Sequence, residues 1–171
     1  MIKVVAFDVF GTVVSLEGVD RAEIKAYANH IRKPEWSPLT LPESWEHLPP
    51  HADSIPGIDC LRPGAMVVTC SNAPLGMMAK LSKNVGLRWD AIIPLELNQV
   101  FKPNPKAYLT VCEVLGVAPE EVLMVTANKD FGDIEGARSV GMRSVLIRHE
   151  SARCRHIVDL VNEFWSELNW R

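Results

Sequence analysis

The sequence predicts an α/β fold, in which a largely parallel, Rossmann-like sheet lies between two layers of helices. Two observations predict it. Short apolar runs, typical of strands buried on both faces, alternate along the chain with stretches of helical periodicity. Polar residues follow where several of these runs end, and in an open parallel sheet ligands bind beyond the carboxyl ends of the strands.

Composition limits the class of protein. The chain has 171 residues, of which 47% are hydrophobic, so we expect one domain with a substantial core. The net charge of −3 gives no reason to expect a nucleic acid or a membrane as partner. The four cysteines form no C-x-x-C pair, and no secretory or membrane-spanning run is recognised. We therefore expect a cytoplasmic protein with reduced thiols that acts on a small molecule.

The first predicted strand starts at Ile2 and ends at Asp8. Gly11 and Thr12 follow it as a turn signal. A carboxylate at the end of a buried parallel strand would lie on the floor of the ligand crevice. Asp8 could instead simply cap the turn, since aspartate is common there.

Residues 14–56 differ in character and predict a small insertion into a core made of residues 1–13 and 57–171. Asp20 followed by Glu23 resembles a capping box, and the apolar spacing after it predicts an amphipathic helix that ends before Pro34. Six prolines and two tryptophans between positions 34 and 56 predict a stiff, irregular segment with a short helical turn at 44–47. We therefore expect a small helical and irregular cap.

The remaining elements follow from periodicity and from residues that start or stop helices. Pro74 and Pro105 suit the first turn of a helix, whereas Gly86 and Gly116 suit its end. Strands are predicted at 65–70, 91–93, 122–125 and 143–147. Helices are predicted at 56–62, 74–85, 105–115, 133–140 and 157–168.

Polar side chains gather at three predicted strand ends. They are Asp8 with Thr12, Ser71 with Asn72, and Asn128 with Asp133, and Lys102 stands just before a helix. This order resembles the haloacid dehalogenase-like superfamily over most of the chain. Its four signatures would be Asp8 with Gly11 and Thr12, then Ser71, then Lys102, and finally Asn128 and Asp133 before a helix with Gly136 and Ala137. Residues 14–56 match the place of the superfamily's first cap insertion, which is very short here.

The resemblance implies a covalent mechanism. Asp8 would attack the substrate, and water would cleave the resulting aspartyl ester or acyl phosphate. An aspartate nucleophile must be ionised and held close to its target, and we expect Lys102 to lower the pKa of Asp8. Thr12 and Asn72 could donate hydrogen bonds to the carboxylate or to a bound anion, and Asp133 could orient Lys102 or the water.

Within the superfamily, two positions favour the 2-haloacid dehalogenase branch. Phosphatases usually carry a second aspartate two residues after the nucleophile, where Phe10 stands and cannot donate a proton. They also usually have an acid where this chain has Asn128. The dehalogenase branch resembles this chain in its aromatic residue at position 10, its Ser71-Asn72 pair, its asparagine at position 128 and its Tyr108. Thr126 would line the same site.

This resemblance implies displacement of halide without metal or other cofactor. The branch also uses a longer cap, with an arginine that holds the substrate, and Arg21 and Arg32 are the candidates here.

Two alternatives stay open. One is a Mg²⁺-dependent phosphatase or phosphonate hydrolase with Asp8, the Phe10 carbonyl and Asp133 as metal ligands; a phosphonate hydrolase would also need Lys25 or Lys33 for an imine. Against it, these two carboxylates and Lys102 sum to a formal charge of about −1, which is weak for Mg²⁺. The other is a non-catalytic binding protein. A homodimer that buries part of the insertion is a further prediction.

Overall fold

A computed structural model describes residues 1–147, 157–164 and 166–168. Within these residues five strands form one sheet in the order β3-β2-β1-β4-β5, and all four neighbouring pairs are parallel. The strands are β1 (Val4–Phe7), β2 (Met66–Ser71), β3 (Ala91–Pro94), β4 (Val122–Thr126) and β5 (Arg143–Leu146). The sheet confirms the predicted α/β class, and its central strand is the one that precedes Asp8.

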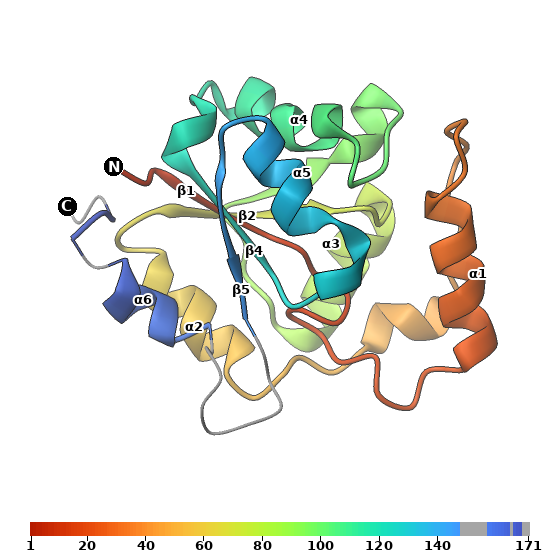
Figure 1. The fold of residues 1–171 in the computed structure, drawn as a ribbon. Coiled ribbons are helices and arrows are strands. Elements are labelled where there is room, and N and C mark those ends of the chain that lie inside the picture. Colours follow the sequence, from red (N-terminus) through yellow and green to blue (C-terminus); the bar gives the residue numbers. More distant parts are fainter. Residues whose placement is uncertain (148–156, 165, 169–171) are drawn as a thin grey trace.

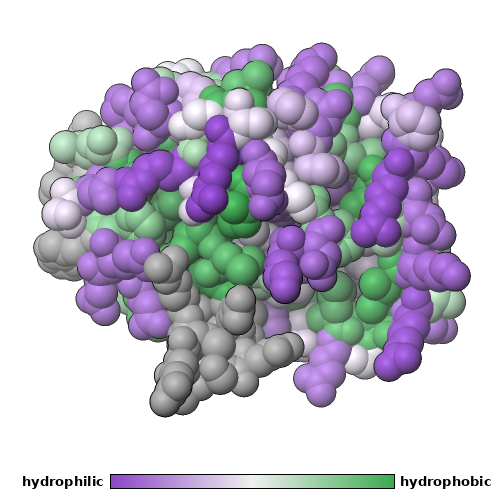
Figure 2. Space-filling view, viewed as in Figure 1, coloured by the Kyte–Doolittle hydropathy of each residue, from purple (hydrophilic) through white to green (hydrophobic). Residues whose placement is uncertain are grey.

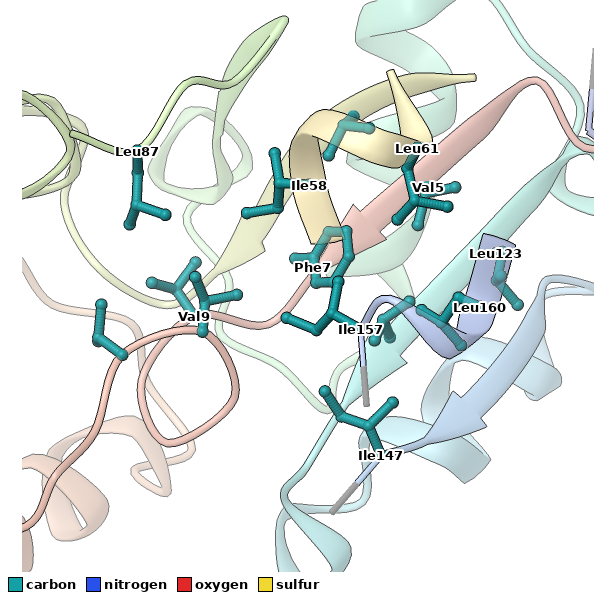
Figure 3. Packing of buried hydrophobic residues seen from close by; sticks show 14 of the residues in the cluster. Val5, Phe7, Val9, Ile58, Leu61, Leu87, Leu123, Ile147, Ile157 and Leu160 are labelled. Atoms are coloured by element: carbon teal, nitrogen blue, oxygen red, sulfur yellow. The ribbon is translucent and has the colours of Figure 1, made fainter. Parts of the chain in front are cut away.

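Helices cover both faces of the sheet, which gives the three layers (Figure 1). One face packs against α2 (Ser54–Leu61), α3 (Leu75–Val85) and α6 (Asp159–Glu163). The other packs against α4 (Pro105–Leu115) and α5 (Asp133–Ser139). Successive residues of β1 alternate between the two cores, and all four are buried. Figure 3 shows Phe7 of β1 among apolar side chains that include Ile58 of α2 and Ile157.

Short 3₁₀ turns join several of these elements. They are η1 (Glu43–His47), η2 (Leu95–Asn98), η3 (Pro119–Glu121) and η4 (Lys129–Phe131). The predicted ends of α4 are confirmed, since the Asn104 side chain accepts from the Lys106 backbone at its start, and Gly116 ends the helix with φ of 63°. The loop that carries Lys102 therefore stops where α4 begins.

The segment 14–56 contains α1 (Arg21–Ile31) and η1, and α1 stands beside the sheet in Figure 1. Asp20 caps α1 by accepting from the Ala22 backbone at 2.8 Å. The carboxylate of Glu23 accepts from the indole of Trp45 at 3.0 Å, so the predicted capping box is replaced by a contact between α1 and η1. Trp45 is fully buried and lies 5.0 Å, centroid to centroid, from Phe10. This tryptophan fixes the insertion against the core.

Two helices, α2 and α6, differ most from their predicted ranges. Helix α2 begins at Ser54 rather than at 56, because the buried Ser54 hydroxyl donates to the Val13 carbonyl at 2.7 Å and anchors the first turn. Helix α6 spans five residues within the predicted 157–168, part of which lies outside the described residues. The division of the chain into core and insertion at 14–56 stays a prediction.

Hydrophilic residues are spread over the face of the molecule that Figure 2 shows, which is viewed as in Figure 1. Small hydrophobic areas lie between them. Cys60, Cys70 and Cys112 are free thiols, and Cys154 lies outside the described residues. In the described part of the chain, no helix combines the length and the hydrophobicity needed to cross a membrane.

Candidate active site

Asp8 lies one residue beyond β1, at the carboxyl edge of the sheet. Phe7 is level with Thr69 of β2 and Val125 of β4, and the Asp8 backbone donates to the Val125 carbonyl at 2.9 Å. The ends of β1 and β4 therefore meet at this edge, where the chain order of the strands reverses. This register places Asp8 beside Thr126 and the loop that follows it.

A tight turn after Asp8 returns Thr12 to the carboxylate. The backbone groups of Thr12 and Val13 both donate to the Val9 carbonyl, and the Thr12 hydroxyl donates to Asp8 Oδ2 at 2.7 Å. Gly11 has φ of +78°, and a Cβ there would lie 3.2 Å from Asn128 Oδ1. A glycine is thus required for both the backbone conformation and the close approach of Asn128.

Lys102 joins two carboxylates inside the protein. Its side chain is 3% exposed, and Nζ lies 2.8 Å from Asp8 Oδ1 and 2.9 Å from Asp133 Oδ2. The Asn72 side chain holds the lysine backbone from both sides, accepting from its N–H at 2.7 Å and donating to its carbonyl at 3.3 Å. Asn72 therefore positions Lys102 rather than contacting the Asp8 carboxylate, while its predicted contact with a bound anion stays a prediction.

Asp133 is the first residue of α5 and is fixed by three donors. Besides Lys102, the Tyr108 hydroxyl donates to Oδ1 at 2.9 Å and the Thr126 hydroxyl donates to Oδ2 at 3.2 Å. One turn further, a Cβ at Gly136 would lie 2.5 Å from the Tyr108 ring. The small residue at 136 thus gives Tyr108 the space it needs to reach Asp133.

Asn128 provides the third donor to the nucleophile candidate. Its Nδ2 lies 2.6 Å from Asp8 Oδ2 and 3.0 Å from the Phe10 carbonyl oxygen. Its own backbone donates to the Thr126 hydroxyl at 3.0 Å, which orders the loop after β4. The amide therefore links the loop after β4 to the turn after β1.

Burial dominates the electrostatics of this group. It raises the pKa of Asp8 above 3.8, and the opposing effect of the Lys102 ammonium does not outweigh it. The expected lowering by Lys102 is therefore present, but burial is the larger effect, so the pKa of Asp8 lies above its ordinary value. For Lys102, burial favours the neutral amine, but Asp133 and Asp8 raise its pKa well above 10.5.

A small cavity of about 50 Å³ opens onto Asp8. The core lines it with polar groups that include Asn72, Lys102, Asn128 and Asp133, whereas the insertion lines it with Leu16, Ile24, Tyr27 and Ile31. Phe10 and Phe131 complete the lining. The cavity is thus polar toward the core and mainly apolar toward the insertion.

Some predicted site residues lie elsewhere. The Ser71 hydroxyl accepts from the Ala73 backbone at 3.3 Å, and Ser71 is absent from the described lining of the cavity. Arg21 is exposed on the first turn of α1. The Arg32 guanidinium lies over the Phe131 ring, 5.3 Å from its centroid, rather than in the cavity. Neither Lys25 nor Lys33 is among the described lining residues.

Two of the three aromatic residues that line the cavity, Tyr27 and Phe131, were not predicted from the sequence. Tyr27 lies on the apolar face that predicts α1, with Ile24 and Ile31, so periodicity marked the face without indicating that it covers a site. Phe131 has no such signal, because it lies in the short turn η4. An aromatic residue in a loop can be assigned to a cavity only from coordinates.

The site thus presents a buried carboxylate that accepts from an ammonium, a hydroxyl and an amide, and that faces a small cavity. Such an arrangement suits a carboxylate nucleophile that forms a covalent intermediate. The chain belongs to the haloacid dehalogenase-like hydrolase family, whose model matches residues 37–141.

Two curated relatives show the range within this family. An (S)-2-haloacid dehalogenase from Xanthobacter autotrophicus is 37% identical over 103 residues, which are 59% of this chain and 40% of the relative. A glyceraldehyde 3-phosphate phosphatase from Pyrococcus furiosus is 32% identical over 74 residues, which are 36% of this chain and 30% of the relative. The match therefore spans less than half the length of either relative.

A solved structure aligns over more of the chain. The L-2-haloacid dehalogenase from Xanthobacter autotrophicus with chloropropionic acid covalently bound is 26% identical, with a TM-score of 0.70. The alignment covers 98% of this chain and 84% of that one. The whole described fold, including the insertion, thus has a counterpart among solved dehalogenases.

Proposed function

We propose that this chain hydrolyses short 2-haloacids through an ester of Asp8, without a metal ion. The observation that carries the proposal is the distribution of donors on the Asp8 carboxylate. In the described part of the chain, Oδ1 accepts one hydrogen bond, from Lys102, whereas Oδ2 accepts two, from Thr12 and Asn128. The two oxygens are therefore prepared for different roles.

Oδ1 is the attacking oxygen, because it keeps a lone pair that is not engaged by a second donor. It forms a bond to the carbon that carries the halogen, and the halide leaves with the electron pair of the carbon–halogen bond. Lys102 holds Oδ1 in place and balances the buried charge before attack. The solved relative named with covalently bound chloropropionic acid supports this step.

Oδ2 then becomes the carbonyl oxygen of the ester. When water attacks Asp8 Cγ, negative charge develops on Oδ2, where the Thr12 hydroxyl and the Asn128 amide already donate at 2.7 and 2.6 Å. The bond between Cγ and Oδ1 breaks, the 2-hydroxyacid leaves with Oδ1, and one carboxylate oxygen now comes from water. Asp133, held by Lys102, is suited to accept the proton of that water.

The donors at this site do not fit Mg²⁺. Asp8 Oδ2 and the Phe10 carbonyl, two of the three ligands a metal would need, both accept from the Asn128 amide, and an amide N–H cannot ligate a cation. The third, Asp133, is paired with Lys102. The described residues also contain no cluster of three or more His, Cys, Asp or Glu side chains that could hold a metal. The proposed reaction therefore involves no metal ion.

Because one relative is a phosphatase, phosphate-ester hydrolysis is the second candidate function. Chloroacetate, 2-chloropropionate and p-nitrophenyl phosphate, each with EDTA or with Mg²⁺, distinguish the two. We expect halide release in EDTA and none from Asp8→Asn, because that variant lacks the nucleophile. Phosphate release that requires Mg²⁺, with no halide release in either condition, would contradict the proposal. A protein that releases neither product would fit a binding role.

A further inference from the structure

The insertion places a single polar side chain against the cavity. Of its four described lining residues, Leu16, Ile24 and Ile31 are aliphatic, and Tyr27 alone has a hydrogen-bond donor. Both candidate arginines lie outside the described lining, Arg21 exposed and Arg32 over the Phe131 ring. Among the side chains that line this wall, Tyr27 is therefore the one that can donate a hydrogen bond to a substrate atom that gains charge.

The ring of Tyr27 is held by two other aromatic residues. It packs edge-on against Phe10 with centroids 5.9 Å apart, and against the fully buried Trp45 at 5.6 Å. Because Phe10 follows the nucleophile by two residues and Trp45 lies in η1, these contacts fix Tyr27 relative to Asp8.

The Tyr27 hydroxyl remains protonated at neutral pH. Burial, together with the negative charge of Asp8, raises its pKa above the ordinary value of 10, and a favourable contact with the Asn72 side chain opposes the shift. Tyr27 lines the same cavity as Asp8 and Asn72. It can donate a hydrogen bond but does not give up its proton.

Displacement at carbon restricts where the leaving atom can lie. The attacking oxygen, the carbon and the halogen must be nearly in line, so the halogen points away from Asp8 Oδ1. The core side of the cavity is occupied by Asp8 and the groups that hold it, so the halogen faces the insertion. On that wall a neutral donor would stabilise the halide as its charge develops.

We propose that the Tyr27 hydroxyl donates a hydrogen bond to the departing halide and determines which halogens the site can release. This inference rests on the proposed haloacid hydrolysis. The carbon–halogen electron pair leaves with the halide, which departs as an anion, and the Tyr27 proton stays on its oxygen.

Tyr27→Phe tests the proposal, because it removes the hydroxyl and keeps the ring contacts with Phe10 and Trp45. Steady-state kinetics would be measured on fluoroacetate, chloroacetate and bromoacetate, with thermal unfolding to verify the fold. We expect kcat/KM on chloroacetate to fall by about 10- to 100-fold, as for loss of one hydrogen bond to a charged group. The loss should be largest for fluoride and smallest for bromide, because fluoride accepts the strongest hydrogen bond. Inhibition by added chloride should weaken in parallel.

Tyr108→Phe is the matched control. It also removes one buried hydroxyl, but that hydroxyl donates to Asp133 and is not part of the described lining. Its loss should be similar for all three halogens. A loss in Tyr27→Phe that is equal for the three halogens would overturn the assignment, and so would a variant that matches the wild type. If the wild-type protein itself releases no halide, the proposed function fails and this inference fails with it.

Discussion

At the scale of the residue, the proposed activity depends on the environment of one carboxylate, that of Asp8. Asp8 is buried, and the side chain of the nearby Thr12 and those of the distant Lys102 and Asn128 converge on it. Strand-end positions predicted Asp8, Thr12, Asn128 and Asp133, since parallel strands end at one edge, whereas Lys102, which precedes a helix, was predicted only through the family resemblance.

The raised pKa of Asp8 predicts an acid limb in the pH profile. Attack requires the carboxylate, so kcat/KM on 2-chloropropionate should fall as the pH drops through a midpoint above 3.8. The ammonium of Lys102, whose pKa lies well above 10.5, should leave the profile flat through neutral and mildly alkaline pH. Initial rates between pH 3.5 and 9.5 measure this, and a midpoint below 3.8 is the contrary result.

Asn128→Asp tests whether the amide is what disfavours a metal. A carboxylate at 128 would repel Asp8 Oδ2 at 2.6 Å and would offer a ligand beside the Phe10 carbonyl. We expect halide release to fall by at least about 100-fold, as for loss of an oxyanion donor, and calorimetry to detect Mg²⁺ binding that the wild type lacks. Unchanged turnover together with no Mg²⁺ binding would argue against this role of Asn128.

The sequence did not indicate which groups the side chains of Asn72 and Ser71 contact, because these contacts depend on loop geometry. Asn72 faces the Lys102 backbone rather than the carboxylate, and Ser71 is engaged by the Ala73 backbone. Ser71 is the last residue of β2 and Asn72 follows it, much as Asp8 follows β1. The direction of each side chain is decided by the path of its loop, which residue types alone do not specify.

At the scale of the element, helices α4 and α5 set the position of Asp133. They meet where Gly136 faces the ring of Tyr108. Periodicity and the proline and glycine boundaries predicted both helices, yet the fit between them appears only in three dimensions. In the same way, the apolar face of α1 was predicted, whereas its use as a wall of the cavity was not.

Gly136→Ala should disturb the site through this contact. The new Cβ would overlap the Tyr108 ring, displace its hydroxyl from Asp133, and cost about 1–3 kcal/mol of unfolding free energy by overpacking. Gly76→Ala is the control, because it lies in α3 with no atom within 4 Å of the added Cβ, and it should stabilise by about 0.4–1 kcal/mol. Chemical denaturation and halide release measure both; equal effects of the two substitutions would contradict the packing argument.

At the scale of the whole molecule, the site exists only once the sheet is complete. Residues 8, 102 and 133 are far apart in the sequence, and their two carboxylates and one ammonium are buried together. Their formal charges sum to about −1 at neutral pH. The fold therefore keeps a charged site in its interior at a cost in stability.

A homodimer that buries part of the insertion stays a prediction, which a measurement of the molecular mass in solution would test.

Asp8→Asn should consequently be more stable than the wild type at neutral pH. Because the pKa of Asp8 is raised on folding, the folded state binds more protons than the unfolded state between 3.8 and the raised value. The stability that protonated Asp8 contributes to the wild type is thus lost as the pH rises through that window. Asparagine does not titrate, so the variant does not lose it. The advantage of the variant should shrink as the pH is lowered toward 4, which denaturation curves at pH 4, 5.5 and 7 would measure; an advantage that grows on acidification is the opposite result.

The most direct test of the central claim is a single turnover with excess protein in ¹⁸O-labelled water. If Asp8 Oδ1 is transferred to the product and water restores the carboxylate, mass spectrometry should find the label in the peptide that contains Asp8 and not in the 2-hydroxyacid. Label in the product of the first turnover, with an unlabelled Asp8 peptide, would show that water attacks the substrate directly and that no ester forms.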